Sequence, residues 1–208
     1  MGQLYDRALI GERCWLRHDD GQRHRLPVNS WLGGHGADAV FDAGVVALCD
    51  GPTIDLGCGP GRLVAHLIQR GIPALGVDQS ATAVRLARRS GAPALLRDVF
   101  EPLPGTGRWQ TVLLADGNVG LSGDPRRILR RAAELLRAGG HCVVEFDPST
   151  AGVRTSWVRL ESAQTVGPWF KWASVGVDCA AILAAEVGLA LVGLHPIGER
   201  VVATLALA

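Results

Sequence analysis

The chain is poor in several kinds of residue, and each shortage excludes a class of protein. Among 208 residues Lys171 is the only lysine, and the formal net charge is +1. A charge so close to zero gives no bulk attraction to nucleic acid or to an anionic membrane. No apolar run is long enough to span a bilayer, and the N-terminal residues lack the apolar stretch of a signal peptide. We therefore expect a cytoplasmic protein whose partners include neither nucleic acid nor a membrane.

Cysteine is also sparse. The five cysteines are scattered, their number is odd, and no Cys-x-x-Cys pair occurs. This pattern indicates neither a zinc site nor a disulfide framework, so no metal is expected and the thiols are expected to be reduced. The basic residues are arginine except for Lys171, and alanine and glycine are abundant, which is typical of coding bias in a GC-rich bacterial genome.

The stretch Thr53–Arg62 organises the chain. A short apolar strand ends in Asp55, three alternating glycines follow at Gly57, Gly59 and Gly61, and an amphipathic run then begins. Glycine lets a ligand lie against bare backbone, and the start of a helix offers free N–H groups with a partial positive charge. The pattern of strand, glycine loop and helix therefore predicts a site for a nucleotide-like cofactor.

Strands and helices alternate after this loop. We expect strands over 74–78, 94–98, 109–115 and 142–146, with helices over 81–89, capped by Ser80, and 124–137, opened by Asp124-Pro125. A helix is also expected over 37–49, before the first strand. This alternation predicts an α/β fold with a doubly wound, mainly parallel sheet.

The two ends of the chain differ from this middle. Residues 11–28 alternate around Asp20-Gly21, which predicts an added N-terminal β-hairpin followed by a loop over 31–36. The Trp-rich segments 153–161 and 169–175 are expected to form a second hairpin. Asp178 is expected to cap a helix reaching Val187, and strands over 189–194 and 201–207 should close the sheet.

The spacing of the glycines bears on which cofactor binds. A dinucleotide fingerprint would place a third glycine where Arg62 stands. The sequence Asp-x-Gly-x-Gly-x-Gly instead resembles the first motif of class I S-adenosylmethionine-dependent methyltransferases, over residues 37–147. The resemblance implies a Rossmann-like methyltransferase fold with seven strands. It also implies one domain, in which 1–36 form the N-terminal hairpin and loop, 37–147 the cofactor-binding core, and 148–208 the substrate-side hairpin and the closing strands.

Four acids follow four consecutive strands, and the resemblance assigns a role to each. Asp55 would order the glycine loop and help to hold the cofactor's amino group, and Asp78 would accept the ribose hydroxyls. Asp98 would accept from the adenine amine, and the loop opened by Asp116 would face the methionine part. The cofactor-binding residues implied are Asp55, Gly57, Cys58, Gly59, Gly61, Asp78, Gln79, Asp98, Val99, Ala115, Asp116 and Gly117.

Candidates for catalysis and substrate binding are fewer. His35, in a glycine-rich loop, and Asp147, just past the fifth expected strand, are the possible general bases. Methyl transfer needs a base only when the acceptor must lose a proton, because the cofactor supplies the activated carbon. Asn118 could orient a substrate group. The tryptophans Trp31, Trp157, Trp169 and Trp172 could line a pocket for a flat or apolar acceptor, or could instead pack the second hairpin onto the sheet.

The function expected from the resemblance is methyl transfer from S-adenosyl-L-methionine to an oxygen or nitrogen of a small molecule, by a monomer or homodimer. S-adenosyl-L-homocysteine would be the product. Two alternatives stay open from the sequence. One is a protein that binds the cofactor without transferring its methyl group. The other is an NAD(P)-dependent oxidoreductase, which would leave Asp98 unexplained.

Overall fold

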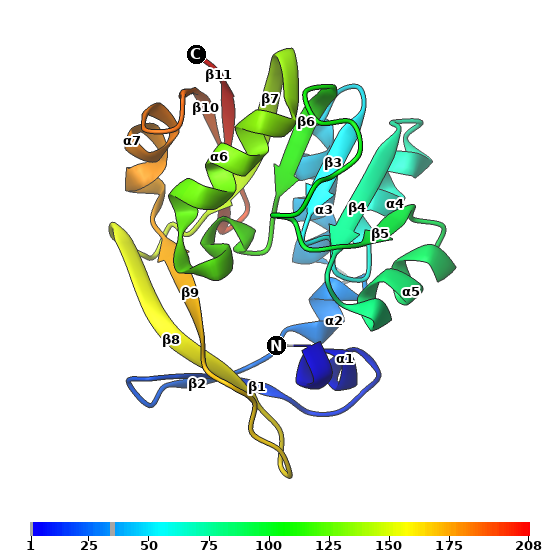
Figure 1. Cartoon of the computed structure of the whole chain (residues 1–208), viewed down its shortest axis with the longest axis vertical. Coiled ribbons are helices and arrows are strands. Elements are labelled where there is room, and N and C mark those ends of the chain that lie inside the picture. The colour runs from blue at the N-terminus through cyan, green and yellow to red at the C-terminus, as the bar shows by residue number, and fades with distance from the viewer. Residues whose placement is uncertain (1, 34–35) are drawn as a thin grey trace.

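Two β-sheets form the framework of the computed structural model, which describes residues 2–33 and 36–208 (Figure 1). The helices are α1 (Gly2–Leu9), α2 (Val28–Trp31), α3 (Ala37–Ala47), α4 (Arg62–Gln69), α5 (Ala81–Arg89), α6 (Pro125–Leu135) and α7 (Ala180–Ala185), with 3₁₀ turns η1 (Asn118–Gly123) and η2 (Val177–Cys179). The strands are β1 (Trp15–His18), β2 (Arg23–Arg25), β3 (Thr53–Leu56), β4 (Ala74–Asp78), β5 (Ala94–Leu96), β6 (Trp109–Leu114), β7 (Leu136–Phe146), β8 (Val153–Glu161), β9 (Phe170–Val175), β10 (Leu189–Ile197) and β11 (Arg200–Leu207).

The larger sheet has seven strands in the order β10-β11-β7-β6-β3-β4-β5. Strands β7, β6, β3, β4 and β5 run parallel, and β11 pairs antiparallel with both β7 and β10. This order confirms the predicted doubly wound, mainly parallel seven-stranded sheet and its closing antiparallel pair. Because the order reverses direction at β3, the carboxyl ends of β3, β4 and β6 border a crevice, where ligands of open α/β sheets bind.

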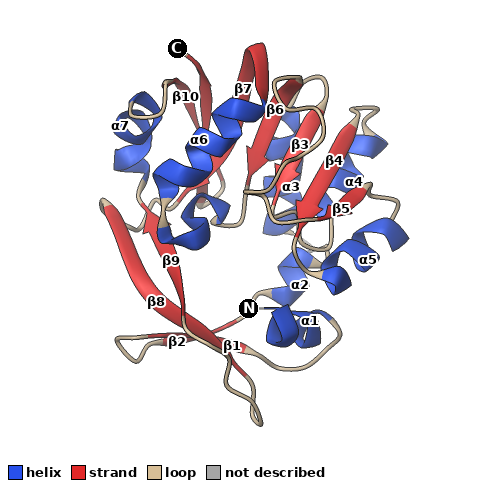
Figure 2. Ribbon diagram, viewed as in Figure 1, coloured by secondary structure: helices blue, strands red, loops and turns tan. Residues whose placement is uncertain are grey.

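Helices cover both faces of this sheet (Figure 2). On one face, residues of α3 and α4 such as Phe41 and Leu67 pack against Leu113 and Val143. On the other, residues of α6 and α7 such as Leu129 pack with Ile54 and neighbouring strand residues. The parallel strands are therefore buried on both sides, which is why they read as short continuous apolar runs in the sequence.

The smaller sheet has four strands in the order β2-β1-β8-β9, all antiparallel. The predicted N-terminal hairpin and the second hairpin both form. What the sequence did not indicate is that they join edge to edge, with Leu16 opposite Leu160. Figures 1 and 2 show this sheet lying across the end of the larger one toward which β3, β4 and β6 point.

The N-terminal region differs from the sequence expectation. Residues 2–9 form helix α1, which was not predicted, and Trp31 ends the short helix α2 where a loop was expected. Leu4 and Ala8 of α1 are buried against Cys14 and Leu160. Tertiary packing of this kind stabilises helices that are too short to form on their own.

Two later boundaries also differ. Helix α6 ends at Leu135 rather than at residue 137, and β7 begins at once, with Leu136 paired to Trp109. Helix α7 spans only 180–185 after a 3₁₀ turn, and Asp178 does not cap it. Instead the Asp178 carboxylate accepts a hydrogen bond at 3.1 Å from the N–H of Gly152, a residue distant in sequence. Among the described residues, no helix combines the length and apolar character needed to cross a bilayer.

Candidate functional site

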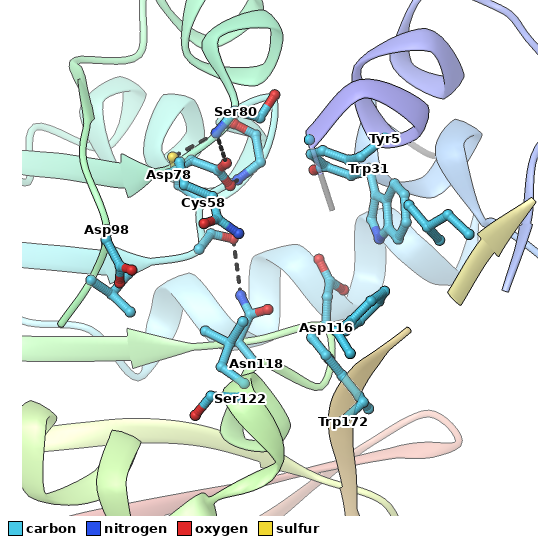
Figure 3. A pocket seen from close by; sticks show the side chains of 18 of the residues that line it. Tyr5, Trp31, Cys58, Asp78, Ser80, Asp98, Asp116, Asn118, Ser122 and Trp172 are labelled. Carbon is cyan, nitrogen blue, oxygen red and sulfur yellow. Dashed lines mark hydrogen bonds between the residues drawn. The ribbon is translucent and has the colours of Figure 1, made fainter. Parts of the chain in front are cut away.

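A cavity of about 650 Å³ lies between the two sheets, at the carboxyl ends of the parallel strands (Figure 3). Its lining falls into two parts. The acidic side comprises Gly57, Cys58, Gly59, Asp78, Asp98, Asp116 and Asn118, all from the larger sheet's strand ends. The apolar side comprises Leu16, Leu26, Trp31, Leu121, Leu160, Phe170 and Trp172, mainly from the smaller sheet and its flanks.

The glycine loop is held tightly to the larger sheet. The N–H groups of Gly57 and Cys58 both donate to the Val77 carbonyl, at 2.8 and 3.0 Å. The Asn118 amide donates to the carbonyls of Leu56 and Gly57 at 3.0 and 2.9 Å. A Cβ on Gly57, whose φ is +80°, would lie 2.7 Å from that amide nitrogen. Glycine is therefore required here, and Asn118, proposed from sequence as a substrate contact, closes the loop.

Asp78 also braces the loop. Its carboxylate accepts from the Gly59 N–H at 2.9 Å and from the Ser80 N–H at 2.7 Å. Burial raises the pKa of Asp78, although these backbone hydrogen bonds oppose the shift. Each carboxylate oxygen keeps a further lone pair for an acceptor bond on the cavity side. Ser80 caps α5, as predicted, by accepting from the Ala83 N–H, and its hydroxyl also bonds to Asp6 of α1.

Asp55 has an unusual environment. The residue is 3 % exposed. Burial, followed by the charge of Asp116, raises the pKa of Asp55 to about 8, against the opposing effect of Arg62. Because burial disfavours the charged form of Asp55, a positive charge brought beside it would favour the carboxylate. Asp55 is therefore suited to a cationic ligand group.

Asp116 lies at the centre of a chain of charges. Arg62 donates to Asp42 at 3.0 Å and to Asp116 at 2.7 Å, and Arg200 donates to Asp116 at 2.7 Å and to Glu145 at 2.6 Å. Burial alone would raise the pKa of Asp116, but the two arginines outweigh it and hold that pKa below its usual range. The backbone of Asp116 has a φ of +53°, which a residue with a Cβ adopts only when its surroundings fix it. The two arginines are part of those surroundings.

Asp98, the acid that follows β5, lies beside an aromatic surface. Its carboxylate accepts from the Phe100 N–H at 2.9 Å, and the Arg127 guanidinium stacks 3.8 Å above the Phe100 ring. Figure 3 places Asp98 at the far end of the cavity from Trp31 and Trp172. The acids at the ends of β4, β5 and β6 thus line one continuous wall.

Most residues that the sequence predicted for the site line this cavity. They are Trp31, Gly57, Cys58, Gly59, Asp78, Gln79, Asp98, Val99, Asp116, Asn118, Trp157 and Trp172. Burial raises the pKa of the Cys58 thiol, which keeps it protonated.

The remaining predicted residues lie elsewhere. Asp55 and Ala115 are buried beneath the wall, and Gly61 lies behind the loop against Ala87. Trp169 stacks on Arg159, with 4.5 Å between the guanidinium carbon and the ring centroid, rather than in the cavity. His35 lies outside the described residues.

Asp147 and Gly117 line a second cavity, of about 530 Å³, on the other side of Trp172. The Asp147 carboxylate accepts from the hydroxyls of Ser149 and Thr150 at 2.7 and 2.6 Å. These hydrogen bonds lower the pKa of Asp147 against the opposing effect of burial, which makes its carboxylate a weak base.

Sequence reasoning missed three residues of the site. Tyr5 reaches over the glycine loop, with its hydroxyl 3.1 Å from where a Cβ of Gly59 would lie, and its ring packs edge-on against Trp31. Burial, with nearby acids, raises the pKa of Tyr5 and keeps the hydroxyl protonated. Arg62 and Arg200 hold Asp116. Arg62 could have been noticed as a charge immediately after the glycine loop, whereas Tyr5 and Arg200 belong to no local pattern.

Comparisons with known proteins bear on this arrangement. A family model described as a methyltransferase domain matches residues 54–140. No curated protein matches the chain. A solved S-adenosylmethionine-dependent methyltransferase of Bacteroides fragilis, in complex with S-adenosyl-L-homocysteine, is 17% identical, with a TM-score of 0.81 over 99% of this chain and 93% of that one.

Two further structures are similar over less of the chain. A 1,6-didemethyltoxoflavin-N1-methyltransferase of Burkholderia thailandensis, with its acceptor and S-adenosylhomocysteine bound, is 19% identical, with a TM-score of 0.62 over 84% of this chain and 79% of that one. The sugar N-methyltransferase KedS8 of a Streptoalloteichus species is 18% identical, with a TM-score of 0.56 over 80% of this chain and 85% of that one. At these identities the likeness establishes the fold.

Proposed function

We propose that the chain is a class I S-adenosylmethionine-dependent methyltransferase, which transfers a methyl group from S-adenosyl-L-methionine to a nitrogen or oxygen of a small molecule. The methyltransferase-domain model that matches residues 54–140 supports this proposal. The observation that carries this proposal is the row of acids beside the glycine loop. Asp78, Asp98 and Asp116 line one wall of the cavity, and Asp55 is buried beneath it.

The carboxylates on the acidic side of the cavity fit the chemistry of this cofactor. S-adenosyl-L-methionine presents an ammonium, a sulfonium, two ribose hydroxyls and an adenine amine, which are positive charges or hydrogen-bond donors. The acidic side offers carboxylates to each. Asp78 would hold the ribose, Asp98 with the Val99 N–H the adenine, and the loop at Asp116 the methionine part. Asp55 would complement the ammonium, since a cation there relieves the cost of its burial.

When bound, S-adenosyl-L-methionine would supply an activated methyl carbon to the acceptor's lone pair, with the sulfur keeping the electrons of the broken carbon–sulfur bond as S-adenosyl-L-homocysteine. The chain's own residues position and shield the reactants, and positioning alone can lower a barrier by roughly 7–11 kcal/mol. The glycine loop and Asp78 fix the cofactor's place. Tyr5 and Trp31 cover it, and Trp172 forms the opposite wall.

A nitrogen acceptor fits the described lining best. No histidine lines the cavity within the described residues, Asp116 is a weak base, and Tyr5 stays protonated. An uncharged amine attacks with its own lone pair and loses its proton to solvent afterwards, so it needs no base. The N-methyltransferases among the structural neighbours agree with this choice. For an acceptor that must first lose a proton, His35 and Asp147 remain our candidate bases.

We also keep three proposals made from the sequence. The whole chain, 1–208, acts as one methyltransferase-like unit. The protein works in the cytoplasm. It is a monomer or a homodimer, which light scattering of the purified protein would decide.

Calorimetric titration with S-adenosylmethionine, S-adenosylhomocysteine, NAD and NADP tests the cofactor. We expect micromolar affinity for the first two alone, and at least about tenfold weaker binding in Asp78→Ala, since a hydrogen bond to a charged group contributes about 1.5–3 kcal/mol. Gln164→Ala, in the exposed turn between β8 and β9, serves as the control. Binding of a nicotinamide nucleotide alone, or unchanged affinity in Asp78→Ala with an intact fold, would contradict the proposal.

A further inference from the structure

Charge is distributed unevenly around the cavity. Its three lining carboxylates, Asp78, Asp98 and Asp116, are all on the acidic side. Three arginines also line that side, and each is engaged there: Arg62 with Asp116, Arg97 with the Pro102 carbonyl and Arg127 with the Phe100 ring. The apolar side presents rings and aliphatic chains, among them Phe170 and Trp172, and no carboxylate from the described residues. A positively charged acceptor would therefore find no counter-charge on the side that the cofactor leaves free.

Lys171 supplies the opposite charge at the edge of the apolar side. It is the chain's only lysine and lines the cavity between Phe170 and Trp172. Its ammonium lies 5.3 Å from the centroid of the Trp157 ring, which also lines the cavity. No carboxylate in the described part of the chain lies within ion-pair distance of it. The ammonium is thus held over an aromatic face without a neutralising partner.

The register of the smaller sheet extends this positive charge beyond the cavity. Lys171 is directly opposite Trp157, and Arg159, two residues further along β8, is opposite Arg17, which is in turn opposite Arg23. Side chains at paired and alternate positions share one face of a sheet, so these four cations lie on the same face, opposite to the one that carries Leu160, Phe170 and Trp172.

A single acid offsets the arginines on that face. Glu161 lies 2.7 Å from Arg159, 3.3 Å from Arg17 and 3.8 Å from Arg23. One carboxylate cannot neutralise three guanidinium groups, so this face keeps an excess of positive charge, and Lys171, on the edge strand β9, is the member of the group that also lines the cavity. Such an excess raises the local concentration of anionic ligands.

From these observations we infer that the methyl acceptor is a ring-bearing anion, with its ring against the apolar side and its carboxylate or phosphate at Lys171. The inference rests on the proposed function, because it concerns the space beside the cofactor. The Lys171 ammonium lies at the cavity's edge, so the acceptor's carboxylate or phosphate stays partly hydrated while the acceptor's ring is buried. This arrangement lets an amine on the ring approach the methyl group as a neutral nucleophile.

The test compares matched ligands on the protein saturated with S-adenosylhomocysteine. The probes are para-aminobenzoate and its neutral counterpart para-aminobenzamide, with phenyl phosphate to distinguish carboxylate from phosphate recognition. Calorimetry should show the benzoate binding about fivefold more tightly than the amide, the upper end of what a partly exposed ion pair contributes. Raising the salt concentration should reduce that preference.

Three variants locate the effect. Lys171→Gln should abolish the preference for the anion, whereas Lys171→Arg should retain it. Arg154→Gln is the matched control, since Arg154 is also a cation of the β8–β9 hairpin but does not line the cavity and pairs with Asp20. Unchanged affinity for S-adenosylhomocysteine in all three shows that the cavity is intact.

The outcomes separate the inference from the proposed function. If the wild-type protein fails to bind S-adenosylhomocysteine, the proposed function is wrong and the inference falls with it. If it binds S-adenosylhomocysteine but takes the amide as tightly as the benzoate, or binds neither probe, only the inference is overturned. Retention of the preference in Lys171→Gln would overturn it equally.

Discussion

The two sides of the cavity are built in different ways. The acidic side comes from neighbouring parallel strands between residues 55 and 118, and its side chains are fixed by hydrogen bonds and ion pairs. The apolar side joins segments near residues 16–31 with segments near 157–172, and packing holds it together. We propose that this difference reflects a division of roles, in which directional contacts would place a charged cofactor and nonpolar walls would exclude water around the acceptor.

Breaking the charge network should have the largest effect. Arg62→Met leaves Asp42 as a buried, unpaired charge, which typically costs about 3–5 kcal/mol. Urea unfolding of the ligand-free protein measures this loss. Arg126→Met is the matched control, because its ion pair with Glu186 is exposed and is worth about 1 kcal/mol at most. Equal losses in the two variants would show that the network does not stabilise the acidic side.

Gly61→Ala should have the next largest effect on stability. The residue has φ +81°, and a Cβ there would lie 2.6 Å from the Cβ of Ala87. Left-handed backbone costs about 1–2 kcal/mol for a residue with a Cβ, and overpacking adds about 1–3 kcal/mol. Gly71→Ala, at φ +76° with open space around it, should show the backbone cost alone. If the unfolding curves of Gly61→Ala and Gly71→Ala coincided, α4 and α5 would have shifted to relieve the clash.

Asp55→Asn tests how the buried, titratable Asp55 affects stability in the absence of a cation. The folded pKa of about 8 lies above the ordinary value near 3.9, so the folded protein binds more protons between these values. The free energy of unfolding of the ligand-free protein should therefore fall as pH rises from about 4 to about 8, and Asp55→Asn should remove this decline. Urea unfolding across this pH range measures both, and a decline of the same size in the variant would exclude Asp55 as its source.

The same substitution should change cofactor binding. A cation beside Asp55 favours the carboxylate, so S-adenosylmethionine should release a proton on binding near neutral pH, and its affinity should rise with pH up to about 8. Calorimetry in buffers of different ionisation enthalpy detects the proton. Asp55→Asn should lose the proton release and weaken binding by about tenfold, since each pKa unit corresponds to about 1.4 kcal/mol. Proton release of wild-type size in the variant would contradict the assignment.

The smallest effect is expected on the apolar side. Trp172→Phe should weaken binding of para-aminobenzoate about two- to tenfold, the range of an aromatic contact worth about 0.5–1.5 kcal/mol. Affinity for S-adenosylhomocysteine should stay unchanged, which is the reverse of the pattern for Asp55→Asn. Trp109→Phe, at the start of β6, is the control and should alter neither affinity. If Trp172→Phe weakened both ligands equally, the two sides would not be separable.

The sequence allowed most of the acidic side to be predicted. Asp55, Asp78, Asp98 and Asp116 each follow an apolar run, and parallel strands bring their ends to one edge. Arg62 and Arg200 were missed because their partners are distant in sequence. The predicted helix cap at Asp178 was wrong because the Gly152 N–H, contributed by a distant segment, takes its carboxylate. Local patterns cannot anticipate such competition.

By itself, the sequence determined the order of strands and helices from residue 37 onward, the place of the glycine loop and the positions of the acids, because each depends on residues within a few positions of one another. Only the tertiary structure decided that the two hairpins join into one sheet, that Tyr5 reaches over Gly59, and that Lys171 borders the cavity. Those features depend on strand pairing and packing between segments far apart in the sequence. The register of the joined hairpins is chosen by burial of a shared apolar face rather than by local preference.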